Sequence, residues 1–151
     1  MTVSDRLPAC RGDGITVYLG DAREGLAALP PASVDCCITS PSYWGLRDYD
    51  PVPQLWGGDA ECHHLWDRPT AGDGEGRFCA AYGAWLGDLG LEPSPELYVR
   101  HLVEVFRAAR RVLKPLATLW LPAGASGRRG PRPLRRFWHN VGVAPAMRIW
   151  E

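Results

Sequence analysis

The sequence contains no run of eighteen apolar residues, which argues against a membrane-spanning helix. The segment from Met1 to Arg11 lacks the apolar stretch of a secretory signal, so we expect a cytoplasmic protein. The five cysteines are odd in number, and Cys36 and Cys37 lie in an apolar run where they resemble small core residues. We therefore expect no disulfide framework, and no internal repeat is visible.

What the sequence does contain is typical of one globular domain with many loops. Its 151 residues are 46% hydrophobic and 23% charged, which suits a single unit with its own core. The 17 glycines and 14 prolines together make up about a fifth of the chain. A large share of the chain is therefore predicted to be turn and loop.

The net charge of zero conceals two parts of opposite sign. Residues 1–104 hold sixteen Asp or Glu and seven Lys or Arg, whereas residues 105–151 hold ten Lys or Arg and one acid. Such a basic segment suits contacts with phosphates, but a solvated, disordered tail is an equal alternative, because Gly124–Pro133 shows no apolar period. We divide the chain into a domain over 1–121 and a basic Gly-, Pro- and Arg-rich tail over 122–151.

The N-terminal half of the domain shows two strand signals and one helix signal. A β-branched and aromatic run at Ile15–Leu19 predicts a strand, and Asp21 is placed to cap a helix that follows it. The run Val34–Thr39 predicts a strand that is buried on both faces. Over about residues 45–92 no period is sustained, and we expect a long irregular loop insertion.

The C-terminal half completes an alternation of strands and helices. Ser94 and Pro95 form a capping signal, after which apolar residues recur at helical spacing as far as Leu113. A further apolar run, Ala117–Leu121, predicts a strand. This alternation predicts an α/β fold with a parallel sheet, in which ligands bind beyond the carboxyl ends of the strands. Ser40, at the end of the second predicted strand, is therefore a candidate site residue on topology alone.

The segment Ser40-Pro41-Ser42-Tyr43 has the chemistry to bind an amino group of a nucleobase. Methylation of such an amine requires acceptors for its two hydrogens, and the Ser40 hydroxyl and the Pro41 carbonyl are suitable acceptors. Tyr43 can stack on a base that has swung out of the duplex, and Trp44 can support the same surface. We therefore take this segment as the candidate catalytic group.

The same segment resembles the Ser/Asp/Asn-Pro-Pro-Tyr/Trp motif of the β-group DNA methyltransferases, which modify exocyclic amines. An initial Ser is typical of the cytosine-N4 enzymes of that family. Flanking segments resemble the family too, so that the likeness covers roughly residues 17–121. These segments are Gly20-Asp21-Ala22-Arg23, Ser33-Val34-Asp35, Trp44-Gly45-Leu46-Arg47-Asp48-Tyr49, Gly83-Ala84-Trp85, Leu89-Gly90-Leu91-Glu92-Pro93 and Thr118-Leu119-Trp120-Leu121.

This resemblance implies a partial Rossmann-like methyltransferase sheet and a site-specific DNA methyltransferase of the kind found in restriction–modification systems. The methyl group comes from S-adenosylmethionine and goes to an exocyclic amine of a flipped base, with cytosine N4 favoured over adenine N6. Ser40, the Pro41 carbonyl and Tyr43 correspond to the catalytic residues, and double-stranded DNA is the implied partner. No covalent enzyme intermediate is involved, so the protein contributes position and electrostatics.

Two departures from the family pattern weaken the expectation of independent catalysis. Ser42 stands where a second Pro is usual, which restores an N–H and loosens the backbone. The segment Phe-x-Gly-x-Gly, which binds the donor in the family, does not occur in the sequence, and the likeness fades from about Leu116, as in a truncated or frame-shifted member. We therefore assign no cofactor-binding residues, expect weak or no donor binding, and consider a separate chain that supplies the donor-binding half.

A loop with Cys and His residues permits a second interpretation. Cys62, His64 and Cys79 have a spacing that could supply three zinc ligands. A structural site needs a fourth ligand, and Tyr82 stands where the resemblance implies a Cys, although His63 or Asp59 could complete the set. On the sequence alone we therefore predict no bound metal.

Proteins of other classes also agree with this sequence. In a catalytically inactive remnant or a non-enzymatic DNA-binding protein, tail residues such as Arg128 and Arg129 would contact phosphates. Binding would then depend steeply on salt and be indifferent to base sequence. A methyltransferase acting on RNA or protein is a third alternative, because the acceptor geometry for amide and base nitrogens is similar.

Overall fold

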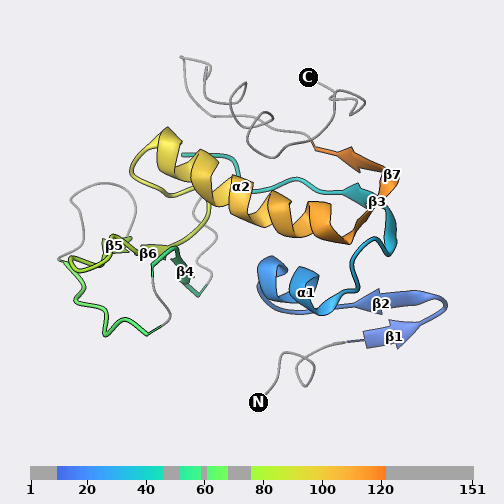
Figure 1. Cartoon of the computed structure of the whole chain (residues 1–151), viewed down its shortest axis with the longest axis horizontal. Coiled ribbons are helices and arrows are strands. Elements are labelled where there is room, and N and C mark those ends of the chain that lie inside the picture. Colours follow the sequence, from blue (N-terminus) through green and yellow to red (C-terminus); the bar gives the residue numbers. More distant parts are fainter. Residues whose placement is uncertain (1–9, 46–51, 59–60, 68–75, 122–151) are drawn as a thin grey trace.

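The computed structural model of the chain describes residues 10–45, 52–58, 61–67 and 76–121, so the predicted basic tail lies outside the described residues. In this part of the chain no helix combines the length and apolarity needed to cross a membrane. The elements, in chain order, are β1 (Cys10–Gly12), β2 (Ile15–Val17), α1 (Ala22–Ala28), β3 (Val34–Ile38), β4 (Gln54–Trp56), β5 (Arg77–Phe78), β6 (Trp85–Gly87), α2 (Pro95–Val112) and β7 (Leu113–Trp120) (Figure 1).

Two strands, β3 and β7, form a parallel pair. Val34 pairs with Leu113 and Ile38 with Trp120, with an irregularity in register after Val34. α2 precedes β7 in the chain and lies across the pair (Figure 1). The predicted α/β class and the parallel pairing of these two strands are therefore confirmed.

The first predicted strand does not join this pair, which corrects the expectation of one parallel sheet. Residues Ile15–Val17 form β2, which pairs antiparallel with β1. The turn between them has positive φ at both central residues, 47° at Asp13 and 78° at Gly14. An Asp-Gly pair in this conformation closes a two-residue hairpin, so a local turn determines the pairing of β2.

The segment expected to be an irregular loop contains a small antiparallel sheet, which is a second correction. β6 is the central strand and pairs with β4 on one side and β5 on the other. Each of these strands is two or three residues long. Strands of this length are too short to show an alternation that a sequence pattern could reveal.

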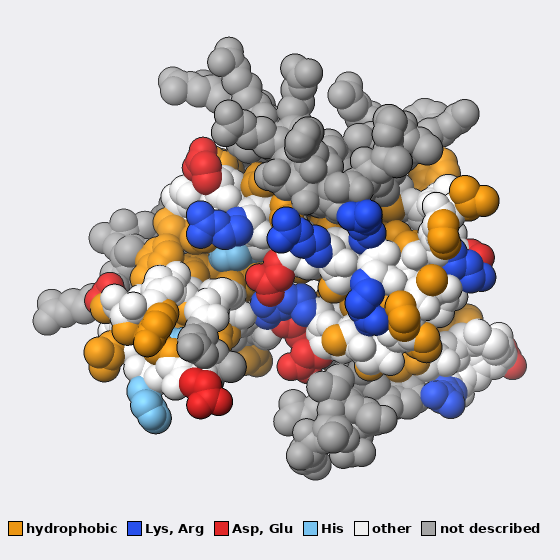
Figure 2. Space-filling view, in the orientation of Figure 1, with side chains coloured by type: hydrophobic (Ala, Val, Ile, Leu, Met, Phe, Trp, Pro, Cys, Tyr) orange, Lys and Arg blue, Asp and Glu red, His pale blue; other side chains and the backbone are white. Residues whose placement is uncertain are grey.

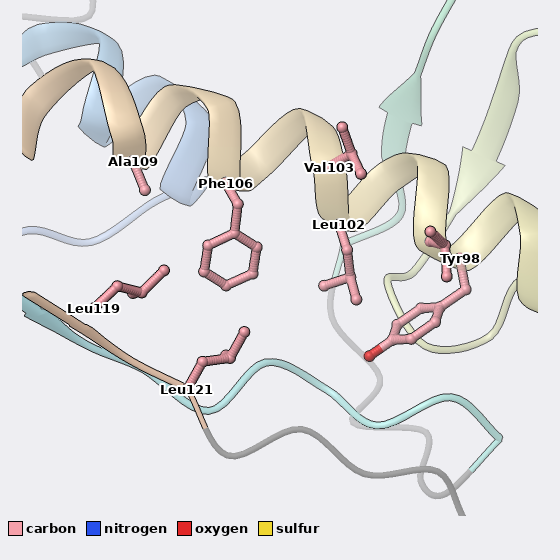
Figure 3. Close-up of a cluster of buried hydrophobic side chains, with 8 residues drawn as sticks. Tyr98, Leu102, Val103, Phe106, Ala109, Leu119 and Leu121 are labelled. Atoms are coloured by element: carbon pink, nitrogen blue, oxygen red, sulfur yellow. The ribbon is translucent and has the colours of Figure 1, made fainter. Parts of the chain in front are cut away.

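α2 is amphipathic, and its buried face forms most of the hydrophobic core (Figure 3). Ser94 caps the helix as predicted, because its Oγ accepts the N–H of Leu97 at 3.2 Å. Burial of each large apolar side chain contributes about 2 kcal/mol to stability. The cluster consists of Tyr98, Val99, Leu102, Val103, Phe106, Ala109, Leu119 and Leu121.

β3 and β7 are covered on one face only, which corrects the prediction of a strand buried on both faces. Leu119 and Cys37 face α2, where they contact the core. Cys36 and Ile38 are exposed on the other face, so only one of the two adjacent cysteines is a core residue. The apolar run in β3 therefore has side chains on both faces, but in the described residues only α2 covers it.

α1 begins at its predicted cap and is fastened to α2 at its other end. The Asp21 carboxylate accepts the backbone N–H of Arg23 at 2.7 Å. The last carbonyls of a helix have no partner within it, and the guanidinium of Arg111 in α2 satisfies three of them. These carbonyls belong to Leu26, Ala27 and Leu29, at 2.6, 3.2 and 2.9 Å.

Candidate functional site

The candidate catalytic group lies directly beyond the carboxyl end of β3. The backbone N–H of Thr39 donates to the carbonyl of Trp120 at 3.1 Å and extends the contact between the two strands. Ser40 is exposed, whereas Pro41 and Tyr43 are half-buried. The segment therefore leaves the strands at the edge where ligands of parallel sheets bind, as the topology predicted.

Ser42, which stands in place of a second Pro, is held by a tyrosine of α2. The Tyr98 hydroxyl donates a hydrogen bond to the carbonyl of Ser42 at 2.8 Å. Burial raises the pKa of Tyr98, and the proximity of Glu92 and Tyr43 raises it further. The phenol is therefore a reliable donor near neutral pH, and it restrains the backbone between Pro41 and Tyr43.

A turn at Gly90 supports the far end of the segment. The N–H of Gly45 donates to the carbonyl of Gly90 at 2.8 Å. Gly90 has a φ of 102°, and a Cβ there would lie 3.1 Å from the Cβ of Ser42 and 3.2 Å from the carbonyl oxygen of Tyr43. The conformation and the close approach both favour glycine. Contacts from α2 and from this turn thus restrain a backbone that lacks the second Pro.

Trp44 faces the core rather than the surface beside Tyr43. Its indole Nε1 donates to the carbonyl of Glu92 at 2.9 Å, and its ring packs against the hydrophobic cluster. A tryptophan with its ring in the core and its N–H bonded to backbone is an anchor. The side chain therefore anchors the segment that carries Tyr43 from the side of the core.

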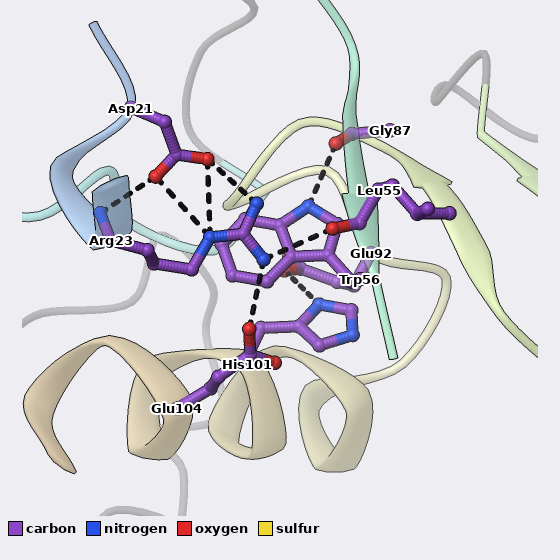
Figure 4. A network of polar contacts seen from close by, with 8 residues as sticks. All are labelled: Asp21, Arg23, Leu55, Trp56, Gly87, Glu92, His101 and Glu104. Carbon is purple, nitrogen blue, oxygen red and sulfur yellow. Dashed lines mark hydrogen bonds and ion pairs between the residues drawn. The ribbon is translucent and has the colours of Figure 1, made fainter. Parts of the chain in front are cut away.

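Glu92 and His101 form a buried pair of a carboxylate and an imidazole (Figure 4). Glu92 Oε2 accepts the N–H of Gly90 at 2.8 Å, and Oε1 lies 2.9 Å from Nδ1 of His101. The His101 ring is stacked between the rings of Trp56 and Trp85, with centroids 4.6 and 5.2 Å away. The small sheet and α2 are joined through these rings, and the same carboxylate shapes the turn at Gly90.

Arg23 extends this network to α1. Its guanidinium lies 4.0 Å from the ring centroid of Trp56, pairs with Asp21 and Glu104 at 2.7 and 2.9 Å, and donates to the carbonyl of Leu55 at 3.0 Å (Figure 4). Burial lowers the pKa of Arg23, but its hydrogen bonds to Asp21 and Glu104 outweigh burial and raise it. Burial raises the pKa of Asp21, but the hydrogen bonds from Arg23 prevail and lower it.

One part of this network, the buried pair of His101 and Glu92, could have been predicted from the sequence but was not. His101 falls on the buried side of α2, between Tyr98 and Leu102. A polar ring on an apolar helix face implies a buried partner, and the partner is Glu92. Arg23 offered no such signal, because Glu104 lies 81 residues away in the sequence.

The fold also brings together the residues that resemble zinc ligands. One ligand atom from each of Cys62, His64 and Cys79 lies within 4.8 Å of the others. Tyr82, which occupies the position of the implied fourth ligand, is exposed. The grouping of these three residues is therefore a property of the fold and not only of their spacing.

Exposed arginines follow the outer face of α2. Figure 2 shows Lys and Arg side chains in a row in the region of this helix. Three arginines of α2, Arg107, Arg110 and Arg111, belong to the basic part of the sequence that begins at residue 105. The exposed arginines of α2 are Arg100, Arg107, Arg110 and Arg111.

Comparisons with known proteins reveal relatives of one kind. The chain is 34% identical over 119 residues to the type II methyltransferase M.SmaI of Serratia marcescens, a match that covers 79% of this chain and 29% of that protein. It is 35% identical over 123 residues to M.Cfr9I of Citrobacter freundii, covering 80% and 30%. M.SfiI of Streptomyces fimbriatus is 30% identical over 115 residues, covering 76% and 19%.

These relatives confirm the resemblance to methyltransferases, at the level of type II enzymes. The chain spans less than a third of the length of the type II methyltransferases it matches. No family model matches the chain. No solved structure matches it either.

Proposed function

We propose that the chain forms the base-binding part of a DNA methyltransferase that modifies an exocyclic amine, with cytosine N4 as the target. One observation carries this proposal. In a chain related to type II methyltransferases, the segment 40–43 lies at the carboxyl end of β3 and is held there by Tyr98 and Gly90. A half-buried tyrosine ring and two oxygen acceptors are thus kept together at an accessible edge.

Each residue of the segment has a distinct part in this proposal. The Ser40 hydroxyl and the Pro41 carbonyl accept the two hydrogens of the amine, which turns its lone pair toward the donor. The Tyr43 ring stacks on the base after it leaves the duplex. Position and electrostatics supply the rate enhancement, because no protein nucleophile is needed.

S-adenosylmethionine supplies the methyl group when it is bound, but the described residues around this segment do not fit it. Gly90, the glycine closest to the segment, is in contact with Ser42 and Tyr43 and leaves no cradle for a ligand. No buried side-chain polar atom of residues 39–45 lacks a hydrogen-bond partner. We therefore propose that a separate chain holds the donor.

A graft into a longer relative tests the base-binding part directly. The 119-residue segment of M.SmaI that matches this chain is replaced by the corresponding residues, and tritiated methyl transfer to DNA is measured. Transfer is expected in the graft and is expected to be weak or absent with the isolated chain. Hydrolysis of the labelled DNA and chromatography of its bases then distinguish cytosine N4 from adenine N6.

Matched variants of the graft test the assignment of residues. Ser40→Ala and Tyr43→Ala are expected to lower transfer by about a hundredfold or more, the scale for loss of a group that binds the transition state. Ser33→Ala and Tyr18→Ala change the same residue types away from the segment and should leave transfer unchanged. Transfer that survives both Ser40→Ala and Tyr43→Ala would remove the site assignment.

The arginines of α2 favour one second candidate, a DNA-binding protein without activity. Phosphate contacts from Arg100 and Arg107 would give affinity that falls steeply with salt and does not depend on Ser40 or Tyr43. Titration of labelled DNA at several salt concentrations, together with the graft assay, separates the two candidates. DNA binding by an inactive graft supports the second.

A further inference from the structure

A compact group of two thiols and an imidazole lies in the small antiparallel sheet, away from the candidate catalytic group. Cys62 and His64 come from the segment 61–67, and Cys79 directly follows β5. The two sulfur atoms are 3.8 Å apart, and a nitrogen of His64 lies within 4.8 Å of both. The structure thus places three soft ligand atoms around one point.

The backbone around Cys79 is folded tightly about its sulfur. Cys79 donates its N–H to the carbonyl of Ala84 at 2.8 Å, and its own carbonyl accepts the N–H of Gly83 at 2.8 Å, with a φ of 64° at Gly83. Ala80 donates to the carbonyl of Leu65 at 2.9 Å and joins this turn to the segment that carries His64. The turn therefore fixes the position of the Cys79 sulfur relative to the other two ligands.

The surroundings of Cys79 favour a thiolate. Backbone N–H groups of Leu65, Ala81 and Tyr82 point toward its sulfur. Backbone N–H groups that point at a sulfur stabilise its negative charge, as they do in structural metal sites. The residue is 1% exposed, so this charge is shielded from water.

A second, independent observation concerns His64. Its Nδ1 is buried and has no hydrogen-bond partner among the described residues. A buried polar atom without a partner requires an explanation, and an ion or a water at that point is one. His64 belongs to the same group of candidate ligands as the sulfurs of Cys62 and Cys79.

From this geometry we propose that Cys62, His64 and Cys79 bind a zinc ion. Two sulfurs bound tetrahedrally at about 2.3 Å from zinc lie about 3.8 Å apart, which agrees with the distance of 3.8 Å between Cys62 and Cys79. A disulfide needs a sulfur separation of about 2.05 Å and is not formed. Thiolate and imidazole ligands select zinc over harder cations, and three protein ligands leave one position open to water.

In this proposal the ion links two segments of the chain, with water at its fourth position. It fastens the segment 61–67 to the turn after β5, beside the strands that carry Trp56 and Trp85. These two rings hold His101 between them, and His101 pairs with Glu92. Zinc binding therefore stabilises the small sheet that packs against α2, whether or not the protein transfers methyl groups. This proposal replaces the sequence-based expectation of no metal.

Metal analysis of the full chain is the test. The protein is purified in reducing buffer, its zinc content is measured, and the zinc-free form is titrated with Co²⁺. We expect one zinc per chain and a cobalt spectrum with thiolate charge-transfer bands and tetrahedral ligand-field bands. A zinc-free protein whose cobalt spectrum shows only six-coordinate ions would overturn the proposal, as would a disulfide between Cys62 and Cys79 in the purified chain.

Variants within and outside the group provide the controls. Cys62→Ser and Cys79→Ser are expected to abolish stoichiometric zinc binding, whereas Cys10→Ser, at an exposed cysteine in β1, should leave it unchanged. Equal loss in all three variants would show that the binding is not specific to this group.

Because Cys79→Ser could fail to fold, Tyr82→Cys gives a second test in the opposite direction. Tyr82 is 63% exposed, so the change is tolerated structurally, and it places a thiol at Cys-x2-Cys spacing from Cys79. Changes of the outer coordination shell alter affinity by about tenfold to a hundredfold, so a new ligand is expected to tighten zinc binding by at least about tenfold. Unchanged affinity in Tyr82→Cys would contradict a site centred on these residues.

Discussion

The two faces of the β3–β7 pair differ sharply. Beneath α2, Leu119 is 4% exposed, whereas Leu116 in the same strand is 95% exposed and Ile38 in its partner is 78% exposed. Neighbouring side chains of a strand point to opposite faces, so apolar residues occur on both. Parallel strands are normally covered on both faces, and no described element packs on the open one. Among the described residues, the open face therefore leaves apolar side chains of both strands exposed.

The candidate catalytic group is supported from the covered side. Tyr98 in α2 and the turn at Gly90 hold it, and Glu92 links that turn to His101. The relatives are more than three times as long as the part that this chain matches. The contrast between the faces agrees with our proposal that a separate chain holds the donor.

The largest expected change in the free energy of unfolding is at Leu119 of β7, and Leu116 in the same strand is its control. Leu119→Ala opens a cavity beneath α2 and is expected to lower the free energy of unfolding by about 3 kcal/mol. Leu116→Ala makes the same chemical change on the open face and should alter it by no more than about 0.5 kcal/mol. Urea denaturation of the full chain measures both. Similar losses in the two variants would mean that the open face is covered in solution.

The next largest loss of stability is expected at the buried pair of Glu92 and His101. Glu92→Ala leaves the Gly90 N–H and the His101 imidazole without their acceptor, and we expect a loss of about 2 kcal/mol in the free energy of unfolding. Glu92→Gln retains an acceptor and should lose less. Glu96→Ala, at an exposed acid in the first turn of α2, is the control and should lose about 0.5 kcal/mol. A Glu92→Ala variant as stable as this control would show that the pair is not buried.

The covered side was also the side that the sequence predicted well. The apolar period from Tyr98 to Val112 predicted α2, and the capping signal predicted its start at Ser94. The run from Val34 predicted β3, and with it the position of Ser40 beyond the strand. Long periodic segments and caps are local signals, so they can be read without knowledge of the tertiary contacts.

What the sequence did not reveal depends on contacts between distant residues. β5 has two residues and is recognisable only by its pairing with β6. Two acceptors of Arg23, Leu55 and Glu104, lie on β4 and α2, far along the chain, and the burial of β3 depends on what packs against it. By contrast, the hairpin signal at Asp13-Gly14 was local, and the β2 pairing could have been predicted from it.

A smaller effect is expected at the hydrogen bond between α2 and the candidate catalytic group. Tyr98→Phe removes the donor to the Ser42 carbonyl and should lower the free energy of unfolding by about 1 kcal/mol near neutral pH. The pKa of Tyr98 is raised in the folded protein, so its contribution is present below the ordinary tyrosine pKa of about 10 and is lost above it. The difference between wild type and Tyr98→Phe should therefore shrink in alkali. A constant difference up to high pH would show that the phenol is not shifted.

The smallest effect is expected at the junction of α1 with the covered side. Asp21→Asn keeps a helix cap but removes the charge that faces Arg23, and the expected loss is about 0.5 kcal/mol near neutral pH. The pKa of Asp21 is lowered in the folded protein, so the charge stabilises it above the unfolded pKa of about 4 and this gain is lost as the pH falls below that value. Urea denaturation should thus give a difference between wild type and Asp21→Asn that disappears in acid. If the difference persists there, the charge of Asp21 is not its source, because Asn retains the cap, and the covered side depends on Arg111 for its link to this helix.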